Sequence, residues 1–365
     1  MTLLRSLRNE WVLLVSVGTL AVFWRWGNLL FAQLANPLWF TLIFLWLFVV
    51  VLASALAVVR HADVLAERLG EPYGTLILTL SVTAIEVMSI SAVMLHGANN
   101  PTLVRDTLFA VVMIILNGMV GLSLLIGGLR HSEQHYNLQG ANAFLGVIIP
   151  LAVFSLILPD FTQTTPGPRL SRHQEIFLTL MSAGLYCAFL TIQTGRHRGF
   201  FTLGDEPAER AAKAREPIAP HALLLIAYMI PVVSLAEKLA HPIDYLVETL
   251  HFPDAWGGLI IALLVATPEA IGAAKAALRN HLQRSMNIFL GSVLATIGLT
   301  VPAMIVMSHI TGRGIDLGLE HTDFVLLLLT LAVNVVTFAS GRTNILQGIV
   351  HLLLFASYVL LLVEG

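Results

Sequence analysis

Long apolar runs alternate with short polar segments along almost the whole chain. Because a helix needs about 20 mostly apolar residues to cross the core of a bilayer, this pattern predicts eleven membrane-spanning helices. We expect them at residues 11–31, 38–60, 74–97, 106–129, 141–159, 175–195, 219–238, 255–277, 286–309, 322–340 and 344–363. The predicted fold class is an all-α polytopic membrane protein.

The composition is typical of an integral membrane protein. Hydrophobic residues make up 57% of the 365 residues and charged residues only 12%, whereas soluble domains carry about 25% charged residues. The lipid bilayer is therefore the first expected partner. A formal net charge of -2 gives no reason to expect nucleic acid, and the single cysteine, Cys187, excludes an intramolecular disulfide.

The N-terminal 35 residues contain a basic start and an apolar run, as a signal peptide would. No A-x-A cleavage site follows the run, and Arg25 between Trp24 and Trp26 is typical of an anchor at the membrane interface. We therefore interpret residues 1–35 as a first transmembrane helix that the mature protein keeps.

The distribution of lysine and arginine orients the predicted bundle. Fourteen of these residues fall in loops on one side and five on the other, and positively charged loops stay in the cytoplasm. The N-terminus is thus expected inside and, with an odd number of helices, the C-terminus outside. The polar segment 196–218 then lies in the cytoplasm, where we expect a charged linker with a short helix.

Two predicted helices resemble each other around an acidic residue that interrupts an apolar span. The third contains T-A-I-E ending at Glu86, the eighth contains A-T-P-E ending at Glu269, and each glutamate is the only acid in its span. Helices five apart cross the membrane in opposite directions, which is the arrangement of an inverted repeat. The sequence therefore predicts two five-helix halves, 36–195 and 219–365, with the site at the membrane midplane.

A carboxylate at that depth needs a charged partner or a proton. Burying it alone costs at least several kcal/mol, and no lysine or arginine lies in the middle of the ten later helices. Protons and cations remain as partners for Glu86 and Glu269, and two nearby carboxylates repel each other, which favours proton uptake. Competition between protons and a cation in a fold that opens alternately to each side predicts cation/proton exchange.

The residues around the two acids are suitable ligands for a hard cation. Thr83 and Ser89 lie three residues from Glu86 on either side, and Thr267 precedes Pro268, which we expect to open the helix and free backbone carbonyls. The helices that follow add further candidates: Asn117 in the first half, and Ser292, Thr296 and Thr300 on one expected face in the second. For Asn117 and Thr296, interhelical hydrogen bonds without an ion are an equal alternative.

The paired acidic repeats, the extra first helix and the polar linker resemble the calcium/cation antiporter superfamily, specifically its cation/proton exchanger branch. The resemblance implies that Glu86 and Glu269 bind cation and protons, that calcium, sodium and potassium are transported and not kept as cofactors, and that the protein is in a bacterial inner membrane. The usual G-N-x-x-E pattern is here V-T-A-I-E and V-A-T-P-E. Both asparagines of the pattern are absent, which puts strict calcium selectivity in doubt.

Other functions are compatible with parts of the pattern. A cation channel or a symporter could use the same acids without exchanging protons. An intramembrane hydrolase could use two carboxylates, but the chain has no nucleophile, phosphate-binding or zinc-protease motif, and its acids occur in repeated contexts. We therefore expect a transporter and not an enzyme.

Overall fold

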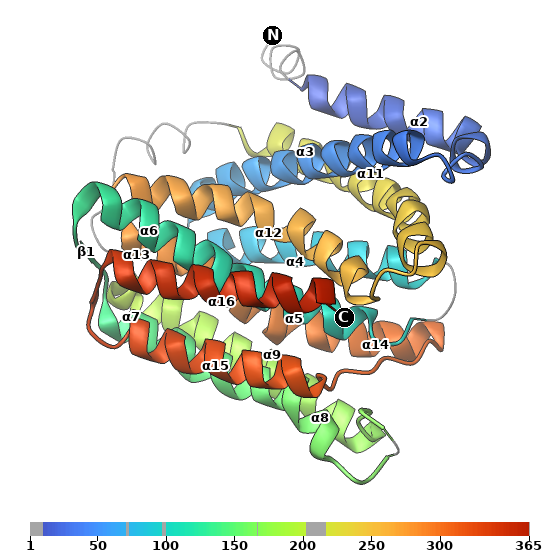
Figure 1. Cartoon of the computed structure of the whole chain (residues 1–365). Helices are drawn as coiled ribbons and strands as arrows, with labels where there is room; N and C mark the ends of the chain where they lie inside the picture. Colours follow the sequence, from blue (N-terminus) through green and yellow to red (C-terminus); the bar gives the residue numbers. More distant parts are fainter. Residues whose placement is uncertain (1–9, 71–72, 97–99, 166, 202–216, 365) are drawn as a thin grey trace. The chain divides into compact units, whose positions relative to one another are not determined.

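The computed structural model describes residues 10–70, 73–96, 100–165, 167–201 and 217–364, and most of these residues are helical. Among these residues, ten helical segments are long and apolar enough to cross a membrane, and a shorter apolar helix, α15 (His321–Thr337), completes the eleven expected helices (Figure 1). The prediction of an all-α polytopic membrane protein is confirmed. Most of the predicted linker helix falls on residues 202–216, outside the described part of the chain.

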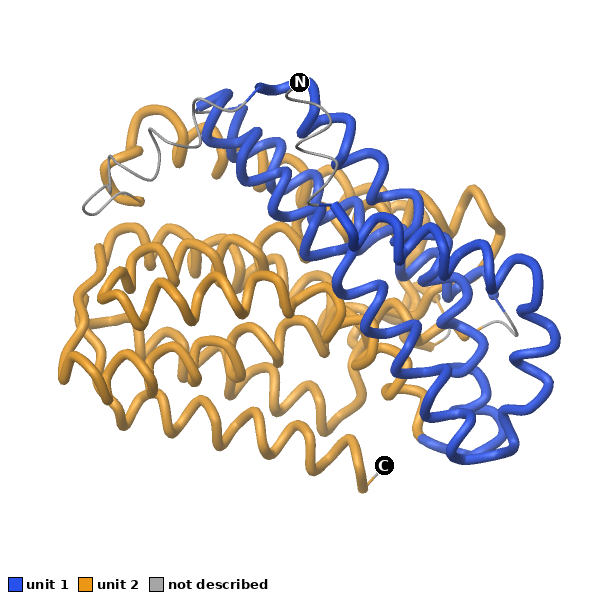
Figure 2. Tube along the Cα trace, turned by 90° about the horizontal axis from the view of Figure 1, so that it is seen from above, with its two compact units in different colours: residues 1–99, 206–252 blue, residues 100–205, 253–365 orange. Residues whose placement is uncertain are grey.

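The chain forms two compact units, which Figure 2 distinguishes by colour. Unit 1 comprises Met1–Asn99 and Glu206–Phe252, and unit 2 comprises Asn100–Asp205 and Pro253–Gly365. Each predicted five-helix half therefore contributes helices to both units. The units group helices by packing, whereas the predicted halves rest on repeated sequence, and the division into halves stays a prediction.

The described residues of unit 1 form four long helices. They are α2 (Trp11–Phe31), α3 (Pro37–Leu69), α4 (Tyr73–Met94) and α11 (Ile218–Asp244), which continues as the π-helical segment η5 (Tyr245–Thr249). Helices α3 and α11 pack along each other, and both α2 and α4 pack against this pair. Asn36 caps the first turn of α3, and Pro37 follows it at a position where no backbone N–H is needed.

Unit 2 contains the remaining helices. One continuous span is formed by α5 (Leu103–Met113), the π-helical segment η1 (Ile114–Met119) and α6 (Val120–His131). The others are α7 (Leu138–Ala152), η2 (Val153–Ile157), α8 (Leu158–Phe161), α9 (Arg172–Thr191), η3 (Ile192–Arg196), η4 (Arg198–Phe200), α12 (Ala255–Leu278), α13 (Leu282–Ala295), η6 (Thr296–Thr300), α14 (Val301–Thr311), α15 and α16 (Ile345–Glu364). Two short antiparallel strands, β1 (Gln134–His135) and β2 (Arg342–Thr343), join the loop after α6 to the loop before α16.

Each helix that carries a predicted carboxylate has a glycine in its first turns. A Cβ on Gly74 of α4 would lie 3.0 Å from the carbonyl carbon of Ala66 in α3. A Cβ on Gly258 of α12 would lie 2.6 Å from the backbone of Asp106 and Thr107 in α5. Within each unit, the absence of a side chain lets the two backbones approach this closely.

Candidate functional site

Glu86 lies near the middle of α4, in unit 1, and is buried. Its exposed fraction is 1%, and Thr83 and Ser89, which lie three residues away on either side, are buried with it. Residues spaced by three share one face of an α-helix, so the predicted stripe of two hydroxyls around one carboxyl is present. Thr83 Oγ1 accepts or donates no hydrogen bond within the described part of the chain.

Glu269 lies on α12, in unit 2, and is half-buried. The expected opening of the helix before it is wrong, because α12 runs without interruption from Ala255 to Leu278. Thr267 Oγ1 donates to the carbonyl oxygen of Leu263, one turn earlier, at 2.5 Å. Pro268 has no N–H to donate to the carbonyl of Leu264, so the helix lacks one backbone hydrogen bond. The helix nevertheless continues through this position.

Asn117 lies in the π-helical segment η1 and is completely buried in unit 2. Its Nδ2 donates to Thr330 Oγ1 of α15 at 2.8 Å, and its Oδ1 lies 3.4 Å from Nδ1 of His351 on α16. These are interhelical hydrogen bonds of the kind expected if no ion binds. A role in cation binding stays a prediction, which has to be compatible with these contacts.

Ser292, Thr296 and Thr300 do not keep the register that the sequence predicts. Ser292 is half-buried in α13, whereas Thr296 and Thr300 are buried in η6, where the helix becomes π-helical. A π-turn bonds residue i to residue i+5 and so contains more residues than an α-turn. The four-residue spacing therefore does not place all three hydroxyls in one straight row.

Packing within unit 2 brings several of these elements together. Helix α12 packs against η1, α13 also packs against η1, and α5 packs against η6. The segments that carry Glu269, Asn117, Ser292 and Thr296 are thus neighbours. Interrupted backbone geometry in the middle of two adjacent spans is typical of functional segments in helical proteins.

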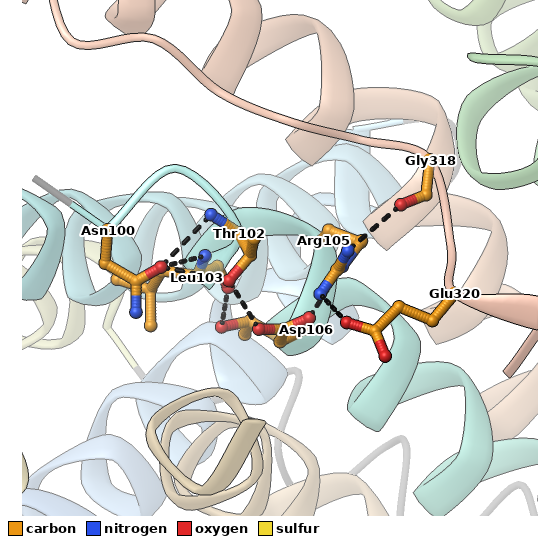
Figure 3. A network of polar contacts seen from close by, with 8 residues as sticks. Asn100, Thr102, Leu103, Arg105, Asp106, Gly318 and Glu320 are labelled. Atoms are coloured by element: carbon orange, nitrogen blue, oxygen red, sulfur yellow. Dashed lines mark hydrogen bonds and ion pairs between the residues drawn. The ribbon is translucent and has the colours of Figure 1, made fainter. Parts of the chain in front are cut away.

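A second polar cluster lies at the end of unit 2 where α5 begins (Figure 3). Arg105 Nε donates to Asp106 Oδ1 at 2.7 Å, and its two terminal nitrogens lie 3.2 Å from the carbonyl oxygen of Gly318 and 3.4 Å from Glu320 Oε1. Asp106 Oδ2 accepts from Thr102 Oγ1 at 2.9 Å. Each charge has a partner, so this cluster fastens the segment before α15 to the first turn of α5.

A third cluster joins the start of α2 to its neighbours in unit 1. Glu10 Oε2 accepts from Arg60 at 2.5 Å and from the hydroxyl of Tyr228 at 2.7 Å, and lies 3.7 Å from His61 Nε2. Burial alone raises the pKa of Glu10, but the Tyr228 hydrogen bond and the charge of Arg60 outweigh it and hold that pKa below its usual value. The carboxylate is therefore ionised at neutral pH, and its contribution to stability is lost only as the pH falls through that lowered pKa.

Residues 39–195 and 220–363 match the family described as sodium/calcium exchanger protein. The chain belongs to this family. Over 317 residues, covering 85% of this chain and 86% of its relative, it is 42% identical to the sodium-potassium/proton antiporter ChaA of Escherichia coli (strain K12). It is 44% identical over 312 residues to the putative ionic transporter y4hA of Sinorhizobium fredii, covering 84% and 85% of the two chains.

Solved structures give the same fold for this exchanger-family chain. The structure of native YfkE has a TM-score of 0.75 at 18% identity and covers 97% of this chain and 100% of its own. The H+/Ca2+ exchanger CAX has a TM-score of 0.64 at 14% identity and covers 94% and 88%. The predicted resemblance to calcium/cation antiporters is confirmed at the level of family and fold.

Two parts of the polar interior were not predicted. His351 lies in a strongly apolar run near the start of α16, and its place near the end of a predicted helix gave no reason to assign it a role. Arg105 was expected in a loop but is buried in the first turn of α5, with an exposed fraction of 8%. For His351 the usable signal was a polar residue within an apolar run, whereas the polar neighbours of Arg105 gave no such signal.

Proposed function

We propose that the protein is a secondary active antiporter that exchanges cytoplasmic cations for external protons by alternating access. Glu86 and Glu269 are the carboxylates that carry both. The substrates are calcium, sodium or potassium on one side of the exchange and protons on the other. Membership of the exchanger family, with a sodium-potassium/proton antiporter among the relatives, supports this reading.

The observation that carries the proposal is the position of Glu86. A carboxyl group with an exposed fraction of 1%, near the middle of an apolar helix and between two buried hydroxyls, has the chemistry of a group that takes either a proton or a cation. If Glu86 were purely structural, there would be no reason for a second glutamate, Glu269, to occur in a similar sequence context in the second half of the chain.

The coupling follows from the cost of an empty site. A deprotonated carboxylate takes a cation on the cytoplasmic side, and protons displace the cation on the external side. The ionised and unloaded form is too costly to rearrange within the membrane, so the carrier crosses only with a cation or with protons bound. The transported ions are thus substrates, and the exchange requires no resident cofactor.

We place the protein in a bacterial inner membrane, with the N-terminus in the cytoplasm and the C-terminus in the periplasm. The excess of lysine and arginine on one side supports this orientation. The relatives in Escherichia coli and Sinorhizobium fredii support the bacterial setting.

The test is proton movement in everted vesicles that have been acidified inside. Addition of calcium, sodium or potassium to the wild type should release protons from the vesicles, and the order of the responses ranks the cations. Glu86→Gln and Glu269→Gln should lose the response at normal protein levels. Glu133→Gln, which changes a half-exposed carboxyl in the loop after α6, is the matched control and should behave as the wild type.

A channel or a symporter is the alternative that this experiment excludes. An uncoupled channel would pass the cation without opposite proton movement, and a symporter would move protons in the same direction as the cation. Absence of cation-dependent proton flux in a wild type that transports the cation would therefore contradict antiport.

A further inference from the structure

A buried network of neutral side chains joins three spans of unit 2. It connects Asn117 of η1 with Thr330 and Thr337 of α15 and with His351 of α16. His351 Nε2 lies 2.9 Å from Thr337 Oγ1, and Nδ1 lies 3.4 Å from Asn117 Oδ1. His351 and Asn117 both have an exposed fraction of 0%. The chemistry of the partners indicates the direction of each hydrogen bond.

The partners of Asn117 decide which amide atom faces the histidine. Met113 Sδ lies 3.3 Å from Nδ2 and can accept a hydrogen but has none to donate. The two hydrogens of Nδ2 are thus used on Met113 and on Thr330, and the amide oxygen faces His351. Because this oxygen can only accept, His351 carries its hydrogen on Nδ1, and Thr337 donates its hydroxyl hydrogen to Nε2.

The specific effect of His351 falls on the amide oxygen. Two bonds from Nδ2 already hold the orientation of the Asn117 side chain, so removal of His351 does not release it. The backbone carbonyl of Leu116 is also a hydrogen-bond partner of the His351 ring. The N–H on Nδ1, 3.4 Å from Asn117 Oδ1, is therefore shared between these two oxygens, and the positive end of its dipole acts on Oδ1. A cation that uses the other lone pair of Oδ1 is repelled by this dipole, and the repulsion grows with the charge of the ion.

Asn117 is close to the segments that carry the other predicted ligands of this unit. Its π-helical segment packs against α12, which carries Glu269, and against α13, which carries Ser292. We propose that His351 is a positioning residue that sets cation preference: by occupying Asn117 Oδ1, it weakens binding of divalent relative to monovalent cations. This inference rests on the proposed exchange function and on Asn117 as a ligand.

Two substitutions at His351 distinguish the contact made by Nδ1 from the contact made by Nε2. Asparagine keeps an N–H near the position of Nδ1, whereas glutamine places its amide toward Thr337 and gives up the donor to Asn117. The measurement is cation-dependent proton flux in proteoliposomes, analysed as half-saturating concentration and maximal rate for calcium, sodium and potassium separately. His173→Gln, an exposed histidine on α9, is the matched control.

We expect His351→Gln to lower the half-saturating concentration of calcium relative to that of potassium by about three- to tenfold, the effect of one hydrogen bond. The maximal rates should stay near wild type, and His351→Asn should retain the wild-type ratio. Equal ratios in the two variants, or the same shift for all three cations, would overturn the inference and leave the exchange function intact. A wild type without cation-dependent proton flux would instead refute the proposed function.

Thr337→Val keeps the proposal testable if the His351 variants do not fold. It leaves His351 in place and removes the hydroxyl that donates to Nε2, so His351 becomes a weaker donor to Asn117. The ratio of the half-saturating concentrations of calcium and potassium should then shift in the same direction as in His351→Gln and by a smaller factor. An unchanged ratio in folded Thr337→Val would overturn the role of His351.

Discussion

Helices α4 and α12 hold their predicted carboxylates in different ways. In α4, Glu86 is buried between two hydroxyls, and Thr83 Oγ1 has no hydrogen-bond partner in the described part of the chain. In α12, Glu269 is half-buried, the hydroxyl of Thr267 is used on a backbone carbonyl, and Pro268 leaves another carbonyl without its usual N–H. If an ion binds at these helices, we expect α4 to contribute side-chain oxygen and α12 to contribute backbone oxygen.

The largest effect is expected at the carboxyl groups themselves. Glu86→Gln and Glu269→Gln remove the charge and the titratable proton while keeping the size of the side chain, so each should lower cation-dependent proton flux at least about 100-fold. Flux assays at matched protein levels measure this. If one variant kept full flux, the two helices would differ in function and not only in the source of their oxygen ligands.

The next effect concerns the close backbone contact of α12. Gly258→Ala places a methyl group against the backbone of α5, and such overpacking costs about 1–3 kcal/mol. We expect less folded protein and a lower thermal midpoint in detergent. Gly272→Ala is the control within the same helix, because its Cβ would meet only Ile288 Cδ1 at an ordinary 3.5 Å. Equal stability of the two variants would show that this contact can relax.

Pro268→Ala tests the backbone contribution of α12. Alanine restores an N–H opposite the carbonyl of Leu264, so that oxygen becomes less available to a cation. We expect the half-saturating cation concentration to rise about tenfold, the equivalent of roughly 1.4 kcal/mol. Pro231→Ala, in α11 of unit 1, is the control and should leave that concentration unchanged. A Pro268→Ala variant with wild-type affinity would remove the backbone ligand from the comparison.

The smallest effect separates two threonines with different partners. Thr83→Val removes a hydroxyl without a hydrogen-bond partner in the described structure, whereas Thr267→Val removes one that is already donated to Leu263. The half-saturating cation concentration should rise about three- to tenfold for Thr83→Val and less for Thr267→Val. The reverse order, measured in the same flux assay, would contradict the assignment of side-chain ligands to α4.

The sequence predicted the spans well where apolar runs end in clear turn residues. The helix containing Glu269 was expected at 255–277 and ends at Leu278, and the first helix has the predicted bounds, Trp11–Phe31. Helix α3 was expected to end at residue 60 but continues to Leu69, because residues 61–69 form helix readily and bury His61 and Leu65 even though several of them are charged. Hydrophobicity alone cannot detect such an extension beyond the bilayer.

The local backbone around the candidate site could not be predicted from residue types. A proline mid-helix removes one hydrogen bond, but whether the helix bends depends on its neighbours, and α12 stays continuous. The π-helical segments at Asn117 and Thr296 also depend on packing, since each inserts a residue into a turn whose sequence is compatible with an ordinary α-helix. The carboxylates were evident because acids in the middle of apolar spans are rare, whereas His351 was not.

The network around Asn117 has a consequence for biosynthesis. Its partners Thr330 and His351 lie 213 and 234 residues further along the chain, so they are synthesised long after the Asn117 span has entered the bilayer. Arg105 likewise donates to the carbonyl oxygen of Gly318, which lies 213 residues further along the chain. During that interval a chaperone, water or another polar segment has to accommodate these groups, and a nascent chain stopped before α15 should be a preferred substrate for membrane proteases.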